Sequence, residues 1–328
     1  MDITFNKVDY YDRINNYKKI IKYFKNFDKN QCLIPVLSND KQEFYEYLFD
    51  KGTIILKKRI GSKSRYGIVF LASNLFSNIP LAIKLTPETS YNLNELILSK
   101  KMSNIAIKDL NPHFLLVYDY FLCATSKINR KLPSLIKYVN YNISINELAD
   151  GNLMHFLIAE DDPIMIMNAY QQILISILSF HYFSGGLYHR DCHYKNFLCH
   201  KIKAGGFLHY RIFGKDIYIE NKGFLWLIWD FGLVKTSLSD KDNRLDDYFR
   251  ANDFFRPSRS YSNPNKFTLI KSFVAKLSNI IDFHKELYGN SDKKLFLELL
   301  FKLENLFPST YNKSSFIINK KAYSIHNF

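Results

Sequence analysis

Hydrophobic residues recur every three or four positions between lysines and asparagines in YYDRINNYKKIIKYFKNF, which predicts an amphipathic helix over about residues 10–27. The next stretch, GTIILKKRIGSKSRYGIVFLAS, is rich in β-branched residues and is interrupted by Gly61 and Gly67, so we expect two strands joined by a glycine-containing turn. Further along, NIPLAIKLT, HFLLVYDYFLC and YNISINELA have the composition of strands, and YNLNELILSKKMSNIAI has helical spacing. A small sheet with one inserted helix, of the α+β type, accounts for this order.

The pattern changes after Gly151, where DPIMIMNAYQQILISILSFHYFSG predicts a long, mostly apolar helix that ends at Gly185 and Gly186. Two strand-like runs follow, YRIFGKDIYIE and FLWLIWDFGLV, and the Gly-Lys-Asp at the centre of the first suggests a hairpin. From Phe267 onward the spacing is helical again. The expected division of the chain is a helical extension at 1–50, a small sheet-based lobe at 51–147 and a larger, mainly helical lobe at 148–328.

Composition and charge narrow the choice of partners only slightly. The chain has 328 residues, of which 47% are hydrophobic and 23% charged, and this is enough for one large globular domain or two lobes. The net charge of +14, from 45 Lys and Arg against 31 Asp and Glu, favours anionic partners such as nucleotides, nucleic acids or membrane surfaces. The basic residues are dispersed, however, and no nucleic-acid-binding motif accompanies them, so we interpret them as solvated faces.

The cysteines indicate a reducing compartment, because they are few for this length and form no Cys-x-x-Cys pair. They are Cys32, Cys123, Cys192 and Cys199. The last two have histidines as neighbours but lack the ligand spacing of a zinc site. The N-terminus, MDITFNKVDYYDR, has no signal-peptide pattern, and AYQQILISILSFHYF is too short and too polar to span a bilayer. We therefore expect a soluble, cytoplasmic protein.

Several polar residues with a shared chemistry stand in a fixed order along the chain. LYHRDCHYKNFLCH contains His189-Arg190-Asp191, with Asn196 five residues after the aspartate, and Asp230-Phe231-Gly232 follows a strand in LIWDFGL. Upstream, LAIK ends at Lys84, and a helix carries Glu95. Together with the glycine turn, these motifs resemble the eukaryotic protein kinase superfamily over about residues 50–235, in the same order as in that family. The resemblance implies a bilobal protein-kinase-like α+β fold.

The resemblance also implies that the protein uses ATP and Mg²⁺ and assigns the residues that handle phosphate. Lys84 would contact the α- and β-phosphates and be held by an ion pair with Glu95, with Glu88 as the alternative partner. Asp191 would accept the proton of the attacking hydroxyl group. Asn196 and Asp230 offer the hard oxygen ligands that Mg²⁺ prefers.

The nucleotide-covering and adenine-binding residues follow from the same resemblance. The backbone around Gly61 and Gly67 would cover the phosphates. The C=O of Glu147 and the N–H of Ala149 would hydrogen-bond the adenine edge, with Asn146 as the gatekeeper. Val69 and Ala82 complete the expected nucleotide site.

Some positions depart from the usual kinase pattern. The residues at the two earlier glycine positions of the phosphate-covering turn are Ser62 and Ser64. Two residues after Asp191, where Ser/Thr kinases usually have Lys, stands His193, which can still donate to phosphate, and Lys195 is a second source of charge. In this respect HRDCHYKNF is closer to haspin-like kinases and to small-molecule phosphotransferases.

Between Asp191 and Asp230 lies an insertion at about 201–222, which we expect to project from the larger lobe. No Ala-Pro-Glu follows Gly232, so the activation segment is short, and either Asp247 or Asp253 is expected to anchor the catalytic loop. The segment NPHFLLVYDYF, the composition, which is typical of an A+T-rich genome, and the insertion together resemble divergent kinases of large cytoplasmic DNA viruses such as the mimivirus group. If the protein is viral, we expect it in the host cytoplasm or in the virion.

Three functions are compatible with these residues. The first is an active Ser/Thr protein kinase that acts on an unidentified protein substrate, because Lys84, Asp191, Asn196 and Asp230 are all present. The second is a nucleotide-binding pseudokinase that serves as a scaffold, which the irregular glycine turn favours. The third is a small-molecule kinase for a hydroxylated metabolite, which His193 favours.

Overall fold

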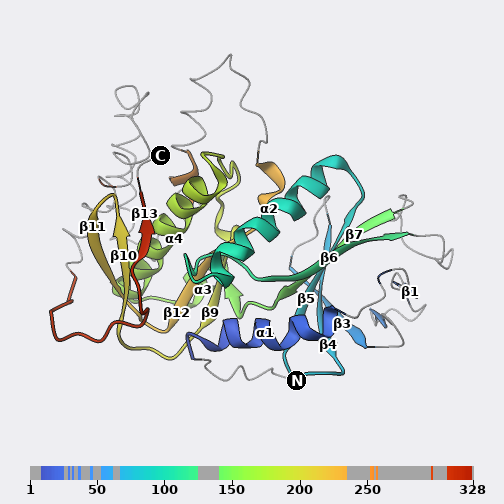
Figure 1. Ribbon diagram of the computed structural model, residues 1–328, viewed down its shortest axis with the longest axis horizontal. Helices are drawn as coiled ribbons and strands as arrows, with labels where there is room; N and C mark the ends of the chain where they lie inside the picture. The colour runs from blue at the N-terminus through green and yellow to red at the C-terminus, as the bar shows by residue number, and fades with distance from the viewer. Residues whose placement is uncertain are drawn as a thin grey trace, which may run out of the picture. The chain divides into compact units, whose positions relative to one another are not determined.

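The computed structural model describes most of the chain in two compact units (Figure 1). The described residues are 9–25, 29, 32, 36–37, 45–46, 53–61, 67–124, 140–234, 252–254, 256–257, 297 and 309–326. The N-terminal unit comprises Tyr11–Ser103 and Leu115–Ala149. The C-terminal unit comprises Met1–Tyr10, Asn104–Phe114 and Asp150–Phe328. Both units combine helices with sheets, which confirms the α+β class.

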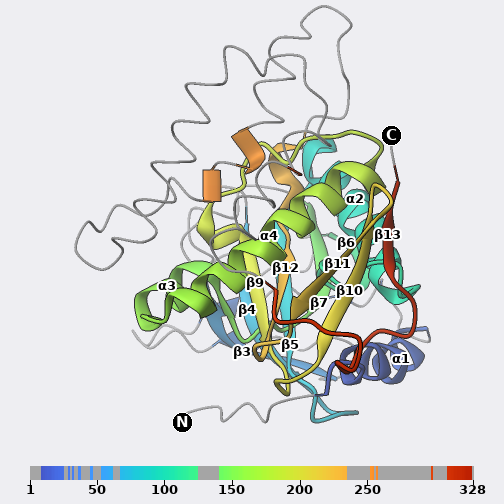
Figure 2. The same ribbon diagram turned by 90° about the vertical axis from the view of Figure 1, so that its left-hand side faces the viewer.

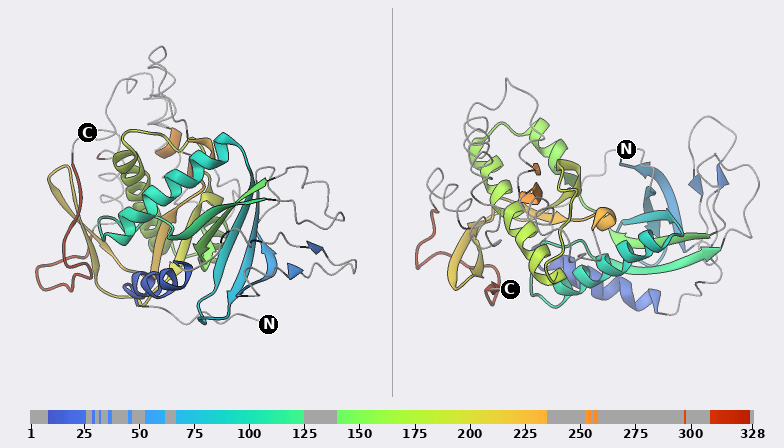
Figure 3. Two further views of the ribbon diagram at one scale, coloured as in Figure 1. Left: turned by 45° about the vertical axis from the view of Figure 1, so that its right-hand side comes forward. Right: turned by 90° about the horizontal axis from the view of Figure 1, so that it is seen from above.

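The N-terminal unit is built on one five-stranded antiparallel sheet, whose strands lie side by side in Figure 3. Its strands, in spatial order, are β3 (Ile54–Ile60), β4 (Ile68–Asn74), β5 (Leu81–Pro87), β7 (Asn140–Glu147) and β6 (Val117–Ala124). Helix α2 (Ser90–Ile107) follows β5 in the chain, as the spacing predicted. A separate pair consists of β1 (Val36–Leu37) and β2 (Tyr45–Glu46).

The predicted N-terminal helix is α1 (Asp12–Phe24), which buries Tyr17, Ile20 and Phe24 and packs against β6. The ring of Tyr17 stacks on that of Tyr118 at 5.7 Å between centroids. Lys100 of α2 donates to the carbonyl of Val117 at 2.8 Å, and burial lowers the pKa of this lysine. The first helix of the chain is therefore part of the N-terminal unit and covers one of its edge strands.

The prediction that the cysteines stay reduced was wrong for one pair. Cys32 and Cys123 form a disulfide between the segment after α1 and strand β6, with their Cα atoms 5.8 Å apart. Sequence spacing could not predict this pair, because the two cysteines are 91 positions apart and approach only in the folded sheet. Cys192 and Cys199 are free and buried.

The described part of the C-terminal unit contains two three-stranded sheets, two longer helices and helical residues at 252–254 and 256–257. The first sheet has the order β12 (Phe224–Ile228), β9 (Phe197–Lys201), β8 (Gly151–Asn152), and the second has the order β11 (Lys215–Glu220), β10 (Phe207–Ile212), β13 (Tyr323–Ile325). The helices are α3 (Leu153–Ala159) and α4 (Pro163–Ser184), with 3-10 turns at Tyr194–Asn196 and Phe231–Leu233. The helices predicted from Phe267 onward lie outside the described residues, apart from one helical position at 297.

Helix α4 lies along β12 and β11, as Figure 2 shows. It begins with Pro163 after Asp162, whose side chain caps the amide of Ile164, and it ends at Gly185 in the left-handed conformation (φ 86°). Contrary to the expectation from sequence, the helix is long and apolar enough to cross a membrane, because an 18-residue window within its 22 residues has a mean hydropathy of 1.3. However, 78% of the apolar window is buried inside the protein, as in the core helix of a soluble domain. The helix therefore does not show a membrane span.

The predicted hairpin in the 201–222 insertion is formed by β10 and β11. Two residues with positive φ, Phe213 (50°) and Gly214 (81°), connect the strands, which is the geometry of a type I′ turn. The expectation that this hairpin projects from the unit was wrong: Leu208, Tyr210 and Ile212 are completely buried. The reason is that β13, near the C-terminus, pairs in parallel with β10 and covers its other edge (Figure 1).

Candidate functional site

A buried ion pair joins β5 to α2 in the N-terminal unit. The Nζ of Lys84 lies 2.5 Å from Oε1 of Glu95, and their side chains are 10% and 6% exposed. Glu88, the alternative partner, is at the exposed surface and accepts a hydrogen bond from Asn140. Since a buried ammonium group is costly without a partner, Glu95 fixes the position of Lys84.

The sheet brings three of the expected nucleotide-site residues onto one face. Val69 is opposite Lys84 in the β4–β5 register, and Ala82 lies two residues before Lys84 on the same strand. Side chains at this spacing share a face of the sheet. Asn146, the expected gatekeeper, is opposite Ala82 and donates to its carbonyl at 3.3 Å.

The two glycines of the predicted phosphate-covering turn have different local roles. Gly61 has a positive φ of 78°, which glycine adopts without strain. A Cβ at Gly67 would lie 2.7 Å from the carbonyl oxygen of Leu85, so this position needs glycine for the close approach of β5. The residues between them, 62–66, lie outside the described part of the chain.

The side chain of Glu147 belongs to a polar cluster that the sequence did not reveal. Arg13 of α1 binds it with two parallel hydrogen bonds, Nε to Oε2 at 2.7 Å and Nη2 to Oε1 at 2.5 Å. The amide of Leu116 also donates to Oε1, at 2.7 Å. Both charged side chains are buried, at 9% and 5% exposed. The cluster fixes the end of β7, while adenine binding by the backbone of Glu147 and Ala149 stays a prediction.

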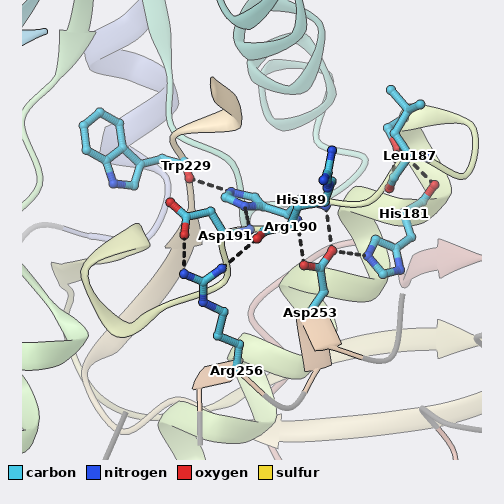
Figure 4. A network of polar contacts seen from close by, with 9 residues as sticks. His181, Leu187, His189, Arg190, Asp191, Trp229, Asp253 and Arg256 are labelled. Atoms are coloured by element: carbon cyan, nitrogen blue, oxygen red, sulfur yellow. Dashed lines mark hydrogen bonds and ion pairs between the residues drawn. The ribbon is translucent and has the colours of Figure 1, made fainter. Parts of the chain in front are cut away.

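In the C-terminal unit, Asp253 anchors the backbone of the predicted catalytic loop (Figure 4). Its carboxylate accepts from the amide of His189 at 2.6 Å and from that of Arg190 at 2.7 Å, and His181 lies 3.1 Å away. These bonds hold Arg190 at a positive φ of 64°, an uncommon conformation for a residue with a side chain. The anchor left open between Asp247 and Asp253 is therefore Asp253, and Asp247 is outside the described residues.

Two contacts tie the predicted catalytic loop to the strand that precedes Asp230. The Nε2 of His189 lies 2.8 Å from the carbonyl of Trp229, while its Nδ1 accepts from the amide of Asp191. A neutral imidazole that carries its proton on Nε2 satisfies both contacts. The amide of Trp229 in turn donates to the carbonyl of Asn196 at 3.2 Å. Asp191, Asn196 and Asp230 are thus brought together within the C-terminal unit.

Among the described residues, the carboxylate of Asp191 has three polar side-chain neighbours, one of which sequence reasoning missed. Asn196 donates from Nδ2 to Oδ2 at 3.2 Å, and His193 lies 3.5 Å from the same oxygen. Arg256 forms an ion pair with Oδ1 at 2.7 Å. Lys195, the expected second cation, forms no ion pair with Asp191 in the described structure.

His193 is a neutral rather than a cationic neighbour of this loop. Its Nδ1 accepts a hydrogen bond from the amide of Lys195 at 3.1 Å. Burial lowers the pKa of His193, although the charge of Asp191 acts in the opposite direction. The imidazole therefore does not replace the lysine charge that the kinase pattern has at this position.

Asp230 stands at the start of the 3-10 turn Phe231–Leu233 in the left-handed conformation (φ 64°, ψ 66°). The next residue, Phe231, is buried and stacks on Phe180 at 4.8 Å between ring centroids. This packing fixes the backbone that carries the carboxylate. Among the described residues no cluster of three or more His, Cys, Asp or Glu side chains could hold a metal ion. A Mg²⁺ site built on Asp230 and Asn196 would therefore depend on phosphate oxygens and water for its other ligands, as is usual for this ion.

Comparison with known proteins does not identify a family for this chain. No family model and no curated protein matches the chain. Among solved structures, a Plasmodium kinase domain is 16% identical over 62% of this chain and 63% of its own, with a TM-score of 0.40. The kinase PK-1 of the Cydia pomonella granulovirus is 16% identical over 58% of this chain and 56% of its own, with a TM-score of 0.36. In both cases the match spans less than two thirds of the neighbour's length, and the function has to be inferred from this chain's own residues.

Proposed function

We propose that the protein is an ATP- and Mg²⁺-dependent protein kinase that transfers the γ-phosphoryl group of ATP to a serine or threonine hydroxyl of an unidentified protein. The observation that carries the proposal is the catalytic loop, in which Asp253 holds the backbone of His189 and Arg190 while Asn196 contacts Asp191. A loop fixed in this way suits phosphoryl transfer, where most of the catalysis comes from positioning and from electrostatic stabilisation.

In the proposed reaction the acceptor hydroxyl oxygen forms a bond to the γ-phosphorus of ATP. The bond between that phosphorus and the β,γ-bridging oxygen breaks, and ADP leaves with its electron pair. The proton of the hydroxyl passes to the carboxylate of Asp191. Because a carboxylate has about four acceptor positions, the bonds from Arg256 and Asn196 leave room for this hydroxyl.

Lys84 has the role of a fixed positive charge. Its ion pair with Glu95 holds the ammonium group on the face of the sheet that also carries Val69 and Ala82. An ammonium group there would bind the α- and β-phosphates of ATP as a point charge. Glu95 contributes by preventing the flexible lysine side chain from taking other positions.

The donor set of the C-terminal unit fits Mg²⁺. Asn196 directs its Nδ2 toward Asp191, which leaves its amide oxygen for a cation, and Asp230 is a carboxylate on a rigid turn. When bound, the ion would neutralise negative charge on the phosphates, which a neutral amide and a carboxylate cannot do. A protein acceptor, as opposed to a small molecule, is supported by the likeness of His189-Arg190-Asp191 and Asp230-Phe231-Gly232 to the protein kinase motifs.

The proposal is tested by incubating the purified full chain with γ-labelled ATP, Mg²⁺ and a mixed protein pool, and in parallel with sugars and aminoglycosides. We expect labelled phosphoserine or phosphothreonine from the wild type and a loss of ~100-fold or more for Asp191→Asn. Asp216→Asn, at an exposed ion pair of the β10–β11 hairpin, serves as the matched control and should keep full activity.

Each other outcome points to a different function. Label on a small molecule but not on protein would favour a metabolite kinase. A rise in melting temperature with Mg-ATP but no transfer to any acceptor would favour a nucleotide-binding scaffold. Equal transfer by the wild type and by Asp191→Asn, with both folded, would contradict the proposed role of the catalytic loop.

A further inference from the structure

Arg256 lies three residues after the buried anchor Asp253 and reaches the opposite side of the same loop (Figure 4). Its Nη2 pairs with Oδ1 of Asp191 at 2.7 Å, and its Nη1 donates to the carbonyl of Arg190 at 2.7 Å. The planar guanidinium group therefore binds both the side chain of Asp191 and the backbone of Arg190. Such a two-point contact fixes orientation better than a single ammonium group does.

Within the loop itself, no described cation forms an ion pair with Asp191 in this way. At 193, where the kinase pattern has lysine, the imidazole of His193 lies 3.5 Å from Asp191 and accepts a hydrogen bond from the amide of Lys195. The ion pairs of Asp191 in the described structure are those with His193 and Arg256. Arg256 is thus the one permanent cation in contact with this carboxylate among the described residues.

The contacts of Asp253 explain why the side chain of Arg256 is held close to the catalytic loop. Asp253 accepts from the amides of His189 and Arg190, so the helical residues around 253 are fixed relative to the loop backbone. Arg256 is on the same short segment, and its side chain is 36% exposed. The segment therefore contacts the loop twice, through a buried anion and through a partly exposed cation.

We propose that Arg256 is the positioning residue of the catalytic loop: it supplies, from a distant part of the chain, the positive charge that the loop lacks at 193, and it orients the carboxylate of Asp191 toward the acceptor hydroxyl. The inference rests on the proposed kinase function and adds a residue to it. A cation on Asp191 weakens it as a base, but phosphoryl transfer has a loose transition state and needs orientation more than base strength.

The test compares the kinetics of wild type, Arg256→Ala and Arg256→Lys in the phosphotransfer assay. We expect Arg256→Ala to lower kcat by ~10- to 100-fold with the KM for ATP within ~3-fold of wild type, and Arg256→Lys to fall between them. Arg211→Ala, which removes an exposed arginine from an ion pair with Asp216, is the matched control and should keep the wild-type kcat.

Two further measurements separate positioning from a general effect on the fold. Combining Arg256→Ala with Asp191→Asn should cause no loss beyond that of Asp191→Asn alone, because both changes act on the same carboxylate. Placing the charge back in the loop, in the double variant His193→Lys/Arg256→Ala, should recover ~10-fold or more of the lost kcat. If Arg256→Ala does not fold, Arg256→Lys and its combination with Asp191→Asn give the same comparison.

Results that would overturn the role of Arg256 alone differ from the result that would overturn the proposed function. An active wild type with an unchanged kcat in Arg256→Ala would overturn the role of Arg256 and leave the proposed function intact. So would additive losses in the double variant with Asp191→Asn, or the absence of recovery by His193→Lys. No transfer by the wild type to any acceptor would overturn the proposed function, and the role of Arg256 with it.

Discussion

The side chain of Asp253 accepts a hydrogen bond from the backbone amide of His189 at 2.6 Å, although the two residues are 64 positions apart. The same carboxylate accepts from Arg190, and its side chain is completely buried. The conformation of the proposed catalytic loop thus depends on an anion that the loop does not contain.

Replacing Asp253 by alanine should destabilise the protein by ~3–5 kcal/mol, because two buried amides lose their acceptor and the packing around His181 is left incomplete. Urea unfolding followed by far-UV circular dichroism measures the change. Asp216→Ala, at the exposed ion pair with Arg211, should leave the unfolding midpoint nearly unchanged. Equal midpoints for wild type and Asp253→Ala would show that the loop does not depend on this anchor.

The ion pair between Lys84 and Glu95 predicts a difference between two glutamates that are close in sequence. Glu95→Gln should lower kcat/KM for ATP by ~10-fold or more, because a neutral amide holds the ammonium group of Lys84 less firmly. Glu88→Gln, at the exposed contact with Asn140, should leave kcat/KM within ~2-fold of wild type. The opposite ranking of the two variants in steady-state kinetics would assign the lysine partner to Glu88.

The pair between Arg13 and Glu147 predicts that helix α1 is needed for the stability of the N-terminal unit. Arg13→Ala should cost ~3–5 kcal/mol in the free energy of unfolding, because it leaves the buried carboxylate of Glu147 without its cation. Adding Glu147→Gln to this variant should restore part of the loss, since the uncompensated charge is then removed.

Chemical denaturation of the single and double variants measures both effects. Lys29→Ala, which breaks a more exposed pair with Asp119, is the control and should cost no more than ~1 kcal/mol. An Arg13→Ala variant as stable as wild type would mean that α1 contributes little to the unit.

The state of the cysteines predicts how many thiols react in the unfolded protein and how fast they react in the folded protein. Unfolded protein without reductant should show two reactive thiols, Cys192 and Cys199, and four after reduction. In the folded protein both should react slowly up to about pH 9, because burial raises the pKa of Cys192 and raises that of Cys199 to about 12. Four thiols in unfolded, unreduced protein would exclude the disulfide.

The raised pKa values of the thiols also determine how the stability of the folded protein changes with pH. A thiol whose pKa is raised on folding stabilises the folded state below its ordinary value of 9.0, and this contribution is lost as the pH rises through and above that value. The midpoint of unfolding should therefore fall between about pH 9 and pH 11 by more in wild type than in Cys199→Ser. Parallel curves for the two proteins would show that Cys199 does not contribute.

Local patterns predicted the parts of this fold that depend on neighbouring residues. The spacing of apolar residues gave α1, α2 and α4 within a few positions, and Gly-Lys-Asp marked the hairpin between β10 and β11. The pairing of Lys84 with Glu95 was also expected, although only from the order of the motifs. In these cases the information lies within one helix, one turn or one motif.

The contacts that sequence reasoning missed join distant segments. Arg13 with Glu147, Cys32 with Cys123, and Arg256 with Asp191 each bring together residues that no local spacing relates. Strand β13 was missed for the same reason, because its three residues pair with β10 from more than 100 positions away. An arginine in an amphipathic pattern has the same appearance whether it faces solvent or a buried carboxylate. Only the folded chain distinguishes these cases.

The proposed function requires this chain to bind ATP with the help of Mg²⁺, through Lys84 in the N-terminal unit and Asp230 in the C-terminal unit, and isothermal titration calorimetry of ATP into the full chain tests this requirement most directly. Wild type should bind ATP more tightly with Mg²⁺ than without, Lys84→Met should lose ~10-fold or more in affinity in both conditions, and Asp230→Asn should lose mainly the gain from Mg²⁺. Binding that is the same in wild type and in both folded variants, or no ATP binding by wild type, would contradict it.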